Sequence, residues 1–163
     1  MTMHDGSVMT RRHLPHIENA GKTYMVTFAT KGRFELALAA RDIVLETVLH
    51  DHRLVYWLHA AVVMPEHVHF IATPLEQWRI AQALQRVKSV SAHRVNRLLN
   101  RHGSLWDQET YDRVVRAGEN VRRACDYVIE NPARRGLGAY RWIWREWVEG
   151  DGTGEGAYPP LED

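Results

Sequence analysis

The sequence has only one cysteine, Cys125, among its 163 residues. A single cysteine excludes an internal disulfide, so we expect a protein of a reducing compartment, the cytoplasm. No apolar run approaches the roughly 18 residues that a membrane-spanning helix needs, and we expect no membrane partner. The first 20 residues lack the apolar central region of a secretion signal, and we expect residues 1–20 to form a polar leader.

Acidic residues are missing from one long stretch, residues 78–106, although the net charge of the whole chain is only +1. A solvated helix face usually mixes both signs of charge. A segment of one sign therefore favours an anionic partner, such as a nucleic acid. The opposite bias begins at Glu146, after which no lysine or arginine occurs. The basic side chains of the stretch are Arg79, Arg86, Lys88, Arg94, Arg97 and Arg101.

The remaining composition is that of an ordinary globular protein, with 45% hydrophobic and 25% charged residues. The length suits a single domain, and the sequence shows neither an internal repeat nor a clear linker. We expect this domain to occupy residues 21–149. The glycine-rich acidic residues 150–163 then form a disordered tail.

Hydrophobic periodicity predicts the order of the elements. It indicates a strand over residues 22–30, a helix over 37–50, two strands over 54–64 and 67–73, a helix over 78–100, a short edge strand within 105–115 and a helix over 118–130. The two middle strands are joined by a tight turn and form an antiparallel hairpin. This order predicts a ferredoxin-like α+β sandwich, with helices on one side of an antiparallel sheet.

Two histidines stand two residues apart in the stretch VVMPEHVHFIA, residues 62–72. Side chains alternate between the faces of a strand, so His67 and His69 point to the same side. Val68 and Phe70 point to the other side, where a core is expected. Two imidazoles on one face of a rigid strand make a chelating pair for a divalent metal. A lone strand histidine is more often structural, but a pair on one face favours metal binding.

Tyr127 and Asn131 stand four residues apart near the end of the last predicted helix, on one stripe of its surface. At about 100° per residue, this stripe flanks the apolar face made by Val121, Cys125 and Val128. The amide oxygen of Asn131 is a hard ligand that suits Mg²⁺ or Mn²⁺. The phenol of Tyr127 can act as a covalent nucleophile when a metal or a base assists it.

These phrases resemble a known family. MPEHVH at residues 64–69 and YVIENPARRGL at residues 127–137 are similar to the MPNHVH and YIxxNPVxxGL patterns of the HUH single-tyrosine transposases, most closely of the REP-associated tyrosine transposase branch. Leu105-Trp106 and the segment 111–115 resemble the part of the family that precedes the catalytic helix. The resemblance covers roughly residues 11–147.

The resemblance implies a ferredoxin-like HUH nuclease domain. His67 and His69 would bind a divalent ion, Mg²⁺ or Mn²⁺, and Asn131 would be the third ligand. Tyr127 would attack a phosphate of single-stranded DNA, form a 5′-phosphotyrosine and free a 3′-hydroxyl. The DNA partner would be a hairpin-forming, repetitive extragenic palindrome-like sequence. Glu66 departs from the family, which usually has asparagine there.

Further DNA contacts are expected outside this centre, because neutralisation of phosphates by basic side chains supplies much of the affinity for DNA. We expect them from Arg11 and Arg12 near the N-terminus and from the basic side chains of the segment from Arg79 to Arg101. Trp106 is our best candidate for stacking on a base. Tyr111 competes with Tyr127 as the nucleophile, but no ligand follows it one helical turn later.

Three questions stay open at this point. The chain can be a DNA-binding module that has lost catalysis and still holds hairpins. It can also be a metal-dependent hydrolase that activates water, with Tyr127 serving only the structure. Finally, a monomer and a homodimer are equally compatible with the sequence.

Overall fold

The computed structural model of the chain describes residues 7–10, 21–116 and 120–146. Their helices are α1 (Leu38–His50), α2 (Ile80–Leu99), α3 (Val121–Ile129), α4 (Asn131–Arg134) and the 3₁₀ turn η1 (Lys31–Arg33). Their strands are β1 (Ser7–Thr10), β2 (Tyr24–Thr30), β3 (Tyr56–Val63), β4 (His67–Pro74), β5 (Trp106–Val114) and β6 (Ile143–Arg145). No helix among these residues is both long and apolar enough to cross a membrane.

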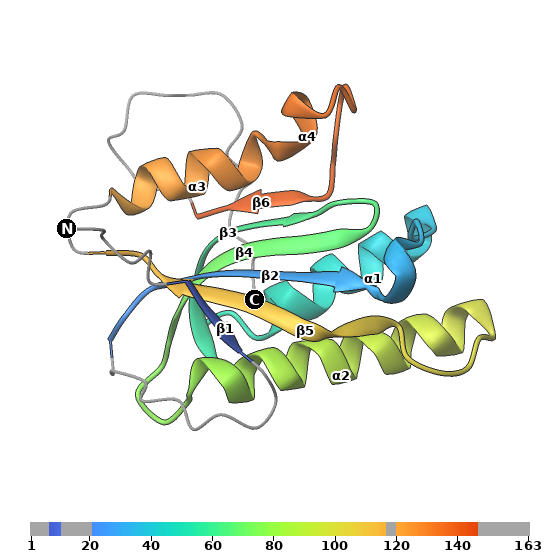
Figure 1. Cartoon of the computed structure of the whole chain (residues 1–163), viewed down its shortest axis with the longest axis horizontal. Coiled ribbons are helices and arrows are strands. Elements are labelled where there is room, and N and C mark those ends of the chain that lie inside the picture. The colour runs from blue at the N-terminus through green and yellow to red at the C-terminus, as the bar shows by residue number, and fades with distance from the viewer. Residues whose placement is uncertain (1–6, 11–20, 117–119, 147–163) are drawn as a thin grey trace.

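The succession β2–α1–β3–β4–α2–β5 is the centre of the fold (Figure 1). Its four strands lie in the order β5-β2-β4-β3, and each neighbouring pair is antiparallel. Two strand–helix–strand units interleaved in this way form a ferredoxin-like sheet. The predicted fold class is therefore confirmed, as are the hairpin of β3 and β4 and the helices α1, α2 and α3.

The sheet extends beyond this motif at both edges. β6 pairs with β3, and β1 pairs with β5. Two expectations differ from this result. The predicted polar leader contains a strand, Ser7–Thr10, and β5 is an interior strand instead of a short edge strand. The arginines Arg11 and Arg12 and the predicted tail at residues 150–163 lie outside the described residues.

Local polar contacts fix where two of the helices begin and end. The backbone N–H of Arg79 donates to the side chain of Gln82 at the start of α2, 3.1 Å away. Asn100 ends α2 in the left-handed region, at φ 47°. At the start of α3, the side chain of Asn120 accepts a hydrogen bond from the backbone of Arg122. These contacts satisfy backbone groups that a helix end leaves without a partner.

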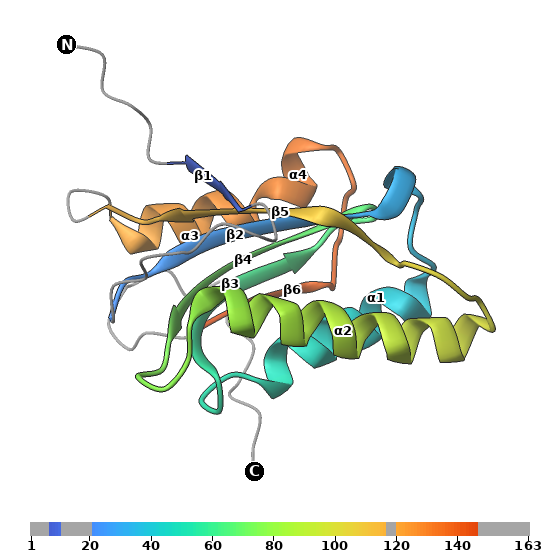
Figure 2. The same cartoon turned by 60° about the horizontal axis from the view of Figure 1, so that its bottom comes forward.

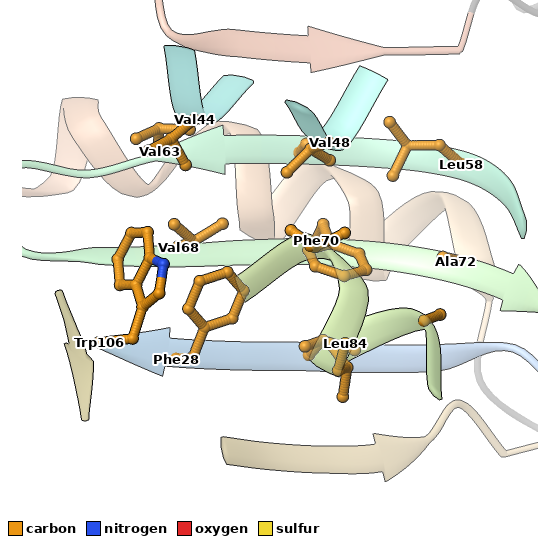
Figure 3. Packing of buried hydrophobic residues seen from close by; sticks show 14 of the residues in the cluster. Phe28, Val44, Val48, Leu58, Val63, Val68, Phe70, Ala72, Leu84 and Trp106 are labelled. Carbon is orange, nitrogen blue, oxygen red and sulfur yellow. The ribbon is translucent and has the colours of Figure 1, made fainter. Parts of the chain in front are cut away.

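One face of the sheet packs on α1 and α2 and contains the larger core (Figure 2). Val68, Phe70 and Ala72 of β4 point into it, and all three are fully buried. Phe28 of β2 lies beside them, with the ring of Trp106 at an edge-on centroid distance of 4.7 Å (Figure 3). The alternation of β4 thus commits every second residue to this core.

The other face is covered by α3 (Figure 2). Ala124, Cys125 and Val128 of α3 pack with Val62 and Ile71 of the sheet. The prediction that the helices lie on one side of the sheet is therefore wrong for α3. A short amphipathic helix satisfies its apolar face on either side of a sheet, so periodicity alone does not choose the side. The result places α3 on the face that carries the histidines.

Candidate active site

The turn before β4 fixes the first histidine in place. The backbone N–H of Met64 donates to the carbonyl of His67 at 2.8 Å and closes the hairpin. The end of β2 and the segment after it hold this turn in place. The backbone N–H of Thr30 donates to the carbonyl of Glu66, and that of Leu36 donates to the carbonyl of Pro65. Backbone hydrogen bonds from two other parts of the chain therefore define where β4 starts.

The two histidines converge on each other. The Nε2 atoms of His67 and His69 are 2.9 Å apart, and the rings lie at 85° to each other. Their other ring nitrogens also have partners. Nδ1 of His69 lies 2.6 Å from the hydroxyl of Thr27, and Nδ1 of His67 lies 2.9 Å from the carboxylate of Glu66. A metal-binding histidine typically uses its second nitrogen in this way, which fixes the ring orientation.

Both rings favour the neutral form. Burial lowers the pKa of His67 below its usual value, although the hydrogen bond to Glu66 opposes the shift. Burial, together with the neighbouring His67, Arg134 and Arg33, lowers the pKa of His69 to about 3. Neutral imidazoles offer lone pairs, which metal binding requires.

The donor set fits a divalent cation. Two ligand nitrogens at right angles, each about 2.1 Å from a metal, are roughly 3.0 Å apart. The 2.9 Å between the Nε2 atoms of His67 and His69 agrees with this value. Within residues 7–10, 21–116 and 120–146, no His, Cys, Asp or Glu joins the pair to make a cluster of three. A third protein ligand from this part of the chain would have to be of another type, such as the Asn131 amide.

The two flanks of α3 face different strands. On one flank, Asp126 accepts a hydrogen bond from Arg145 of β6, beyond β3. Asn131 lies beyond the end of α3, at the start of α4. Residue 127 follows Asp126 by about 100° around the helix, so Tyr127 lies on the flank of α3 away from β6, toward β4. This is the side on which the histidines lie. For Tyr127, the predicted position beside the apolar face agrees with the buried face that Ala124 and Val128 make. The prediction that Asn131 continues the same helical stripe is wrong, because α3 ends at Ile129 and Asn131 begins α4.

An ion pair brings the end of the helical segment to the histidine turn. Arg135 follows α4, and its guanidinium donates to the carboxylate of Glu66, the residue before His67. Asn131 begins α4, and its carbonyl accepts a hydrogen bond from the backbone of Arg135 at 3.2 Å. The predicted third ligand thus lies in the short turn that contacts the histidine-bearing hairpin.

Tyr127 is open to solvent and is held by a cation. The residue is 55% exposed, as a nucleophile for a large substrate has to be. The guanidinium of Arg134 lies 4.2 Å from the centre of its ring and donates to its carbonyl at 2.6 Å. A cation over the face of an aromatic ring is attracted to it. Arg134 therefore restricts the ring of a residue that stays open to solvent.

Positive charge gathers around the histidines, and our sequence reasoning missed it. Arg33 and Arg134 both act on the electrostatics of His69, and Arg135 acts on His67. Arg33 is exposed and adopts the left-handed region, at φ 57°. Arg134 and Arg135 stand in the family-like segment YVIENPARRGL, residues 127–137, so the sequence could have indicated these two charges. Arg33 is far away in the sequence, and only the fold brings it here.

Helix α2, which carries most of the predicted basic side chains, packs on the face of the sheet opposite to α3 (Figure 2). Arg86 pairs with Asp51 and Arg94 pairs with Glu46, so both join α2 to α1 or to the turn after it. Lys88 donates to β5. These contacts explain the one-sided charge in part, and DNA binding by this helix stays a prediction. Of the other predicted basic residues, Arg79 caps the start of α2, Arg97 lies in its last turn and Arg101 follows its end.

Trp106 is a core residue, which corrects its assignment as a platform for stacking on bases. The residue is only 5% exposed. Its indole N–H donates to the hydroxyl of Ser91 at 2.9 Å, and its ring packs against Phe28. It opens β5 and belongs to the core on the α1 and α2 side of the sheet. A base cannot reach a ring that is enclosed in this way.

Tyr111 shares the histidine face of the sheet. It pairs in register with Thr27, which in turn pairs with His69. The residue is 49% exposed, but its hydroxyl donates to Glu109 at 3.0 Å. That hydrogen bond raises the pKa of Tyr111, and a raised pKa disfavours the phenolate that attacks a phosphate. Tyr111 is therefore the weaker candidate for the nucleophile.

Comparison with known proteins gives one family and two solved structures. The family model described as "Transposase IS200 like" matches residues 21–130. A structure of a REP-associated tyrosine transposase bound to a REP hairpin shares 19% sequence identity, with a TM-score of 0.62, over 77% of this chain and 75% of that one. This likeness shows the fold.

A second structure is that of a proposed transposase from Deinococcus radiodurans R1. It shares 22% identity over 72% of this chain and 95% of that chain, with a TM-score of 0.46. No curated protein sequence matches the chain.

The neutral state of His69 predicts a pH-dependent stability. In the metal-free protein, the unfolded chain takes up a proton below about pH 6.5, whereas the folded ring resists it down to about pH 3. Stability is therefore present above pH 6.5 and falls as the pH drops toward 3, by up to about 1.4 kcal/mol per pH unit for one such group. Urea unfolding with a chelator at pH 7, 6 and 5 measures it.

The variant His69→Gln should flatten this pH dependence. The exposed His102 gives the matched control, and His102→Gln should keep the wild-type slope. An unchanged slope in His69→Gln would show that His69 is not held neutral by the fold.

Proposed function

The chain belongs to the IS200-like transposase family, and from this premise we propose that it is a metal-dependent endonuclease and strand transferase for single-stranded DNA. Tyr127 is the nucleophile in this proposal, and His67, His69 and Asn131 hold the divalent ion. The substrate is a hairpin-forming DNA of the repetitive extragenic palindrome type. The solved relative that is bound to a REP hairpin supports this choice of substrate. Activity on DNA would place the protein in the cytoplasm, as its single cysteine predicted.

One observation carries the proposal: the Nε2 atoms of two imidazoles converge to 2.9 Å on the face of the sheet that α3 covers. Two lone pairs directed at one point repel each other, unless a proton or a cation lies between them. The flank of α3 that turns toward β4 carries the phenol of Tyr127, and the amide of Asn131 follows at the start of α4. A cation site and a nucleophile on one open face are what an attack on a phosphodiester needs.

His67, His69 and Asn131 would hold Mg²⁺ or Mn²⁺, since two nitrogens and a hard amide oxygen leave further positions for phosphate oxygens. The ion, when bound, polarises the phosphate as a Lewis acid. The protein supplies the ligands, the ring orientations set by Thr27 and Glu66, and the shielding of His67 from solvent. Arg33 and Arg134 add positive charge where a phosphate would approach.

In the proposed step, the hydroxyl oxygen of Tyr127 forms a bond to the phosphorus, and the bond from phosphorus to the 3′-oxygen breaks. The phenol loses its proton to solvent, and the leaving 3′-oxygen gains one. The products are a 5′-phosphotyrosine and a free 3′-hydroxyl. No nucleotide cofactor is needed, because the covalent link conserves the bond energy and the 3′-hydroxyl of a strand can attack it in return.

A single chain is sufficient for this site. α3 packs through Ala124, Cys125 and Val128 on the sheet of its own chain. Arg135 ties the following turn to the hairpin of the same chain. We therefore propose that Tyr127 serves the histidines of its own molecule, and that a second copy is not required for cleavage.

The substitution Tyr127→Phe tests the nucleophile. We expect it to abolish the covalent DNA–protein adduct and to leave hairpin binding within about twofold, because the ring is kept and only the attacking oxygen is lost. The measurement uses a labelled single-stranded hairpin pool with Mn²⁺, followed by denaturation with detergent and gel analysis.

Tyr111→Phe is the matched control, since this second exposed tyrosine lies on the same face. The control should still form the adduct. Loss of the adduct in Tyr111→Phe alone would move the chemistry to Tyr111. Cleavage that persists without an adduct in Tyr127→Phe would indicate an activated water, and hairpin binding without any cleavage in the wild type would indicate a module that only binds DNA.

The substitutions His67→Ala and His69→Ala test the metal site. Each removes one of two converging nitrogens, so we expect Mn²⁺ binding in calorimetry to weaken at least tenfold, and cleavage to be lost. His102→Ala, on an exposed loop, should behave as the wild type does. Undiminished Mn²⁺ binding in either of the first two variants would place the metal elsewhere.

A further inference from the structure

Glu66 contacts both parts of the candidate site. It lies in the turn directly before His67, and its side chain is only 19% exposed. Its carboxylate lies 2.9 Å from Nδ1 of His67 and also accepts a hydrogen bond from Arg135. A carboxylate that pairs with a guanidinium is ionised at neutral pH. One ionised carboxylate thus joins a histidine to the turn after α4.

The charge of Glu66 sets the direction of a series of hydrogen bonds that runs from Glu66 through His67 and His69 to Thr27. An ionised carboxylate accepts hydrogen bonds and cannot donate one. His67 must therefore carry its proton on Nδ1, which leaves the lone pair of Nε2 directed at His69. His69 then donates from Nε2 to His67 across 2.9 Å, and the hydroxyl of Thr27 donates to Nδ1 of His69 at 2.6 Å.

The hydrogen bond between Thr27 and His69, at the other end of this series of hydrogen bonds, can reverse its direction. A threonine hydroxyl donates or accepts, so His69 can move its proton to Nδ1 and still keep its bond to Thr27. Both Nε2 lone pairs are then free for a cation. Glu66 cannot reverse in the same manner, and it holds His67 in the form that binds a metal whether or not an ion is present. The amide of an asparagine at this position would both donate and accept, and would impose no single form.

Through Arg135, the carboxylate of Glu66 also contacts the turn that carries Asn131. The guanidinium of Arg135 bonds to Glu66, and the backbone N–H of Arg135 bonds to the carbonyl of Asn131, which begins α4. The position of Asn131 relative to the histidine hairpin is therefore linked to Glu66 through Arg135. A charge-assisted contact of this kind, on a side chain that is mostly enclosed, is stronger than a surface pair.

We infer that Glu66 is a positioning residue, which fixes the Nδ1-protonated form of His67 and, through Arg135, holds the turn of Asn131 against the β3–β4 hairpin. The metal-binding part of this inference rests on the proposed function. The protonation pattern of His67 is a property of the metal-free protein and is tested without it.

The direct test is nitrogen-15 NMR of the histidine rings in metal-free protein, which distinguishes a protonated Nδ1 from a protonated Nε2. The wild type should show His67 protonated on Nδ1. Glu66→Ala should shift it to Nε2 or to a mixture, and Glu66→Gln, which is less disruptive to the fold, should shift it in part. Glu35→Gln is the matched control, because Glu35 also pairs with an arginine, Arg41, but contacts no histidine.

A second measurement follows Mn²⁺ affinity by calorimetry. Removing a partner that orients a metal-binding histidine costs about 10–100-fold in affinity, and we expect this loss for Glu66→Ala. Arg135→Ala should lose less. The double variant should bind no more weakly than Glu66→Ala alone, because the arginine acts through the carboxylate.

Two results would overturn the inference: His67 that stays protonated on Nδ1 in Glu66→Ala, or losses of affinity that add fully in the double variant. A wild-type protein that binds no Mn²⁺ would instead contradict the proposed metal site. The NMR result would still decide the role of Glu66 in that case.

Discussion

The candidate site depends on the packing of α3 against the face of the sheet that carries His67 and His69. Ala124, Cys125 and Val128 bury against this face, and burial of such apolar side chains contributes on the order of 1–3 kcal/mol each. This contact determines the direction in which the flank of Tyr127 points. Without it, the phenol would have no fixed relation to the histidines, although each group would still be present.

The sheet divides its two faces between stability and chemistry. Val68, Phe70 and their neighbours on β2 face α1 and α2 and form the larger core. The alternate residues of the same strands face the other way, where α3 covers β3 and β4. Strand alternation therefore places a metal-binding pair directly behind a rigid core. A site built in this way is held more precisely than one that is carried by loops.

The sequence predicted the fold class, the histidine pair and the flanking position of Tyr127, because each depends on a local period of two or about 3.6 residues. Trp106 was assigned wrongly because its burial depends on the packing of α2 against the sheet, which local periodicity does not reveal. Arg33 was missed for the same kind of reason. Its place beside the histidines follows from backbone hydrogen bonds between the segment after β2 and the β3–β4 turn.

Anomalous diffraction from crystals grown with Mn²⁺ tests the central claim most directly. The account predicts one strong peak between the Nε2 atoms of His67 and His69, with the Asn131 amide and the Tyr127 hydroxyl of the same chain facing it. A peak away from this pair would contradict the metal site. A peak at the pair, faced by Tyr127 of a second copy, would contradict assembly of the site within one chain.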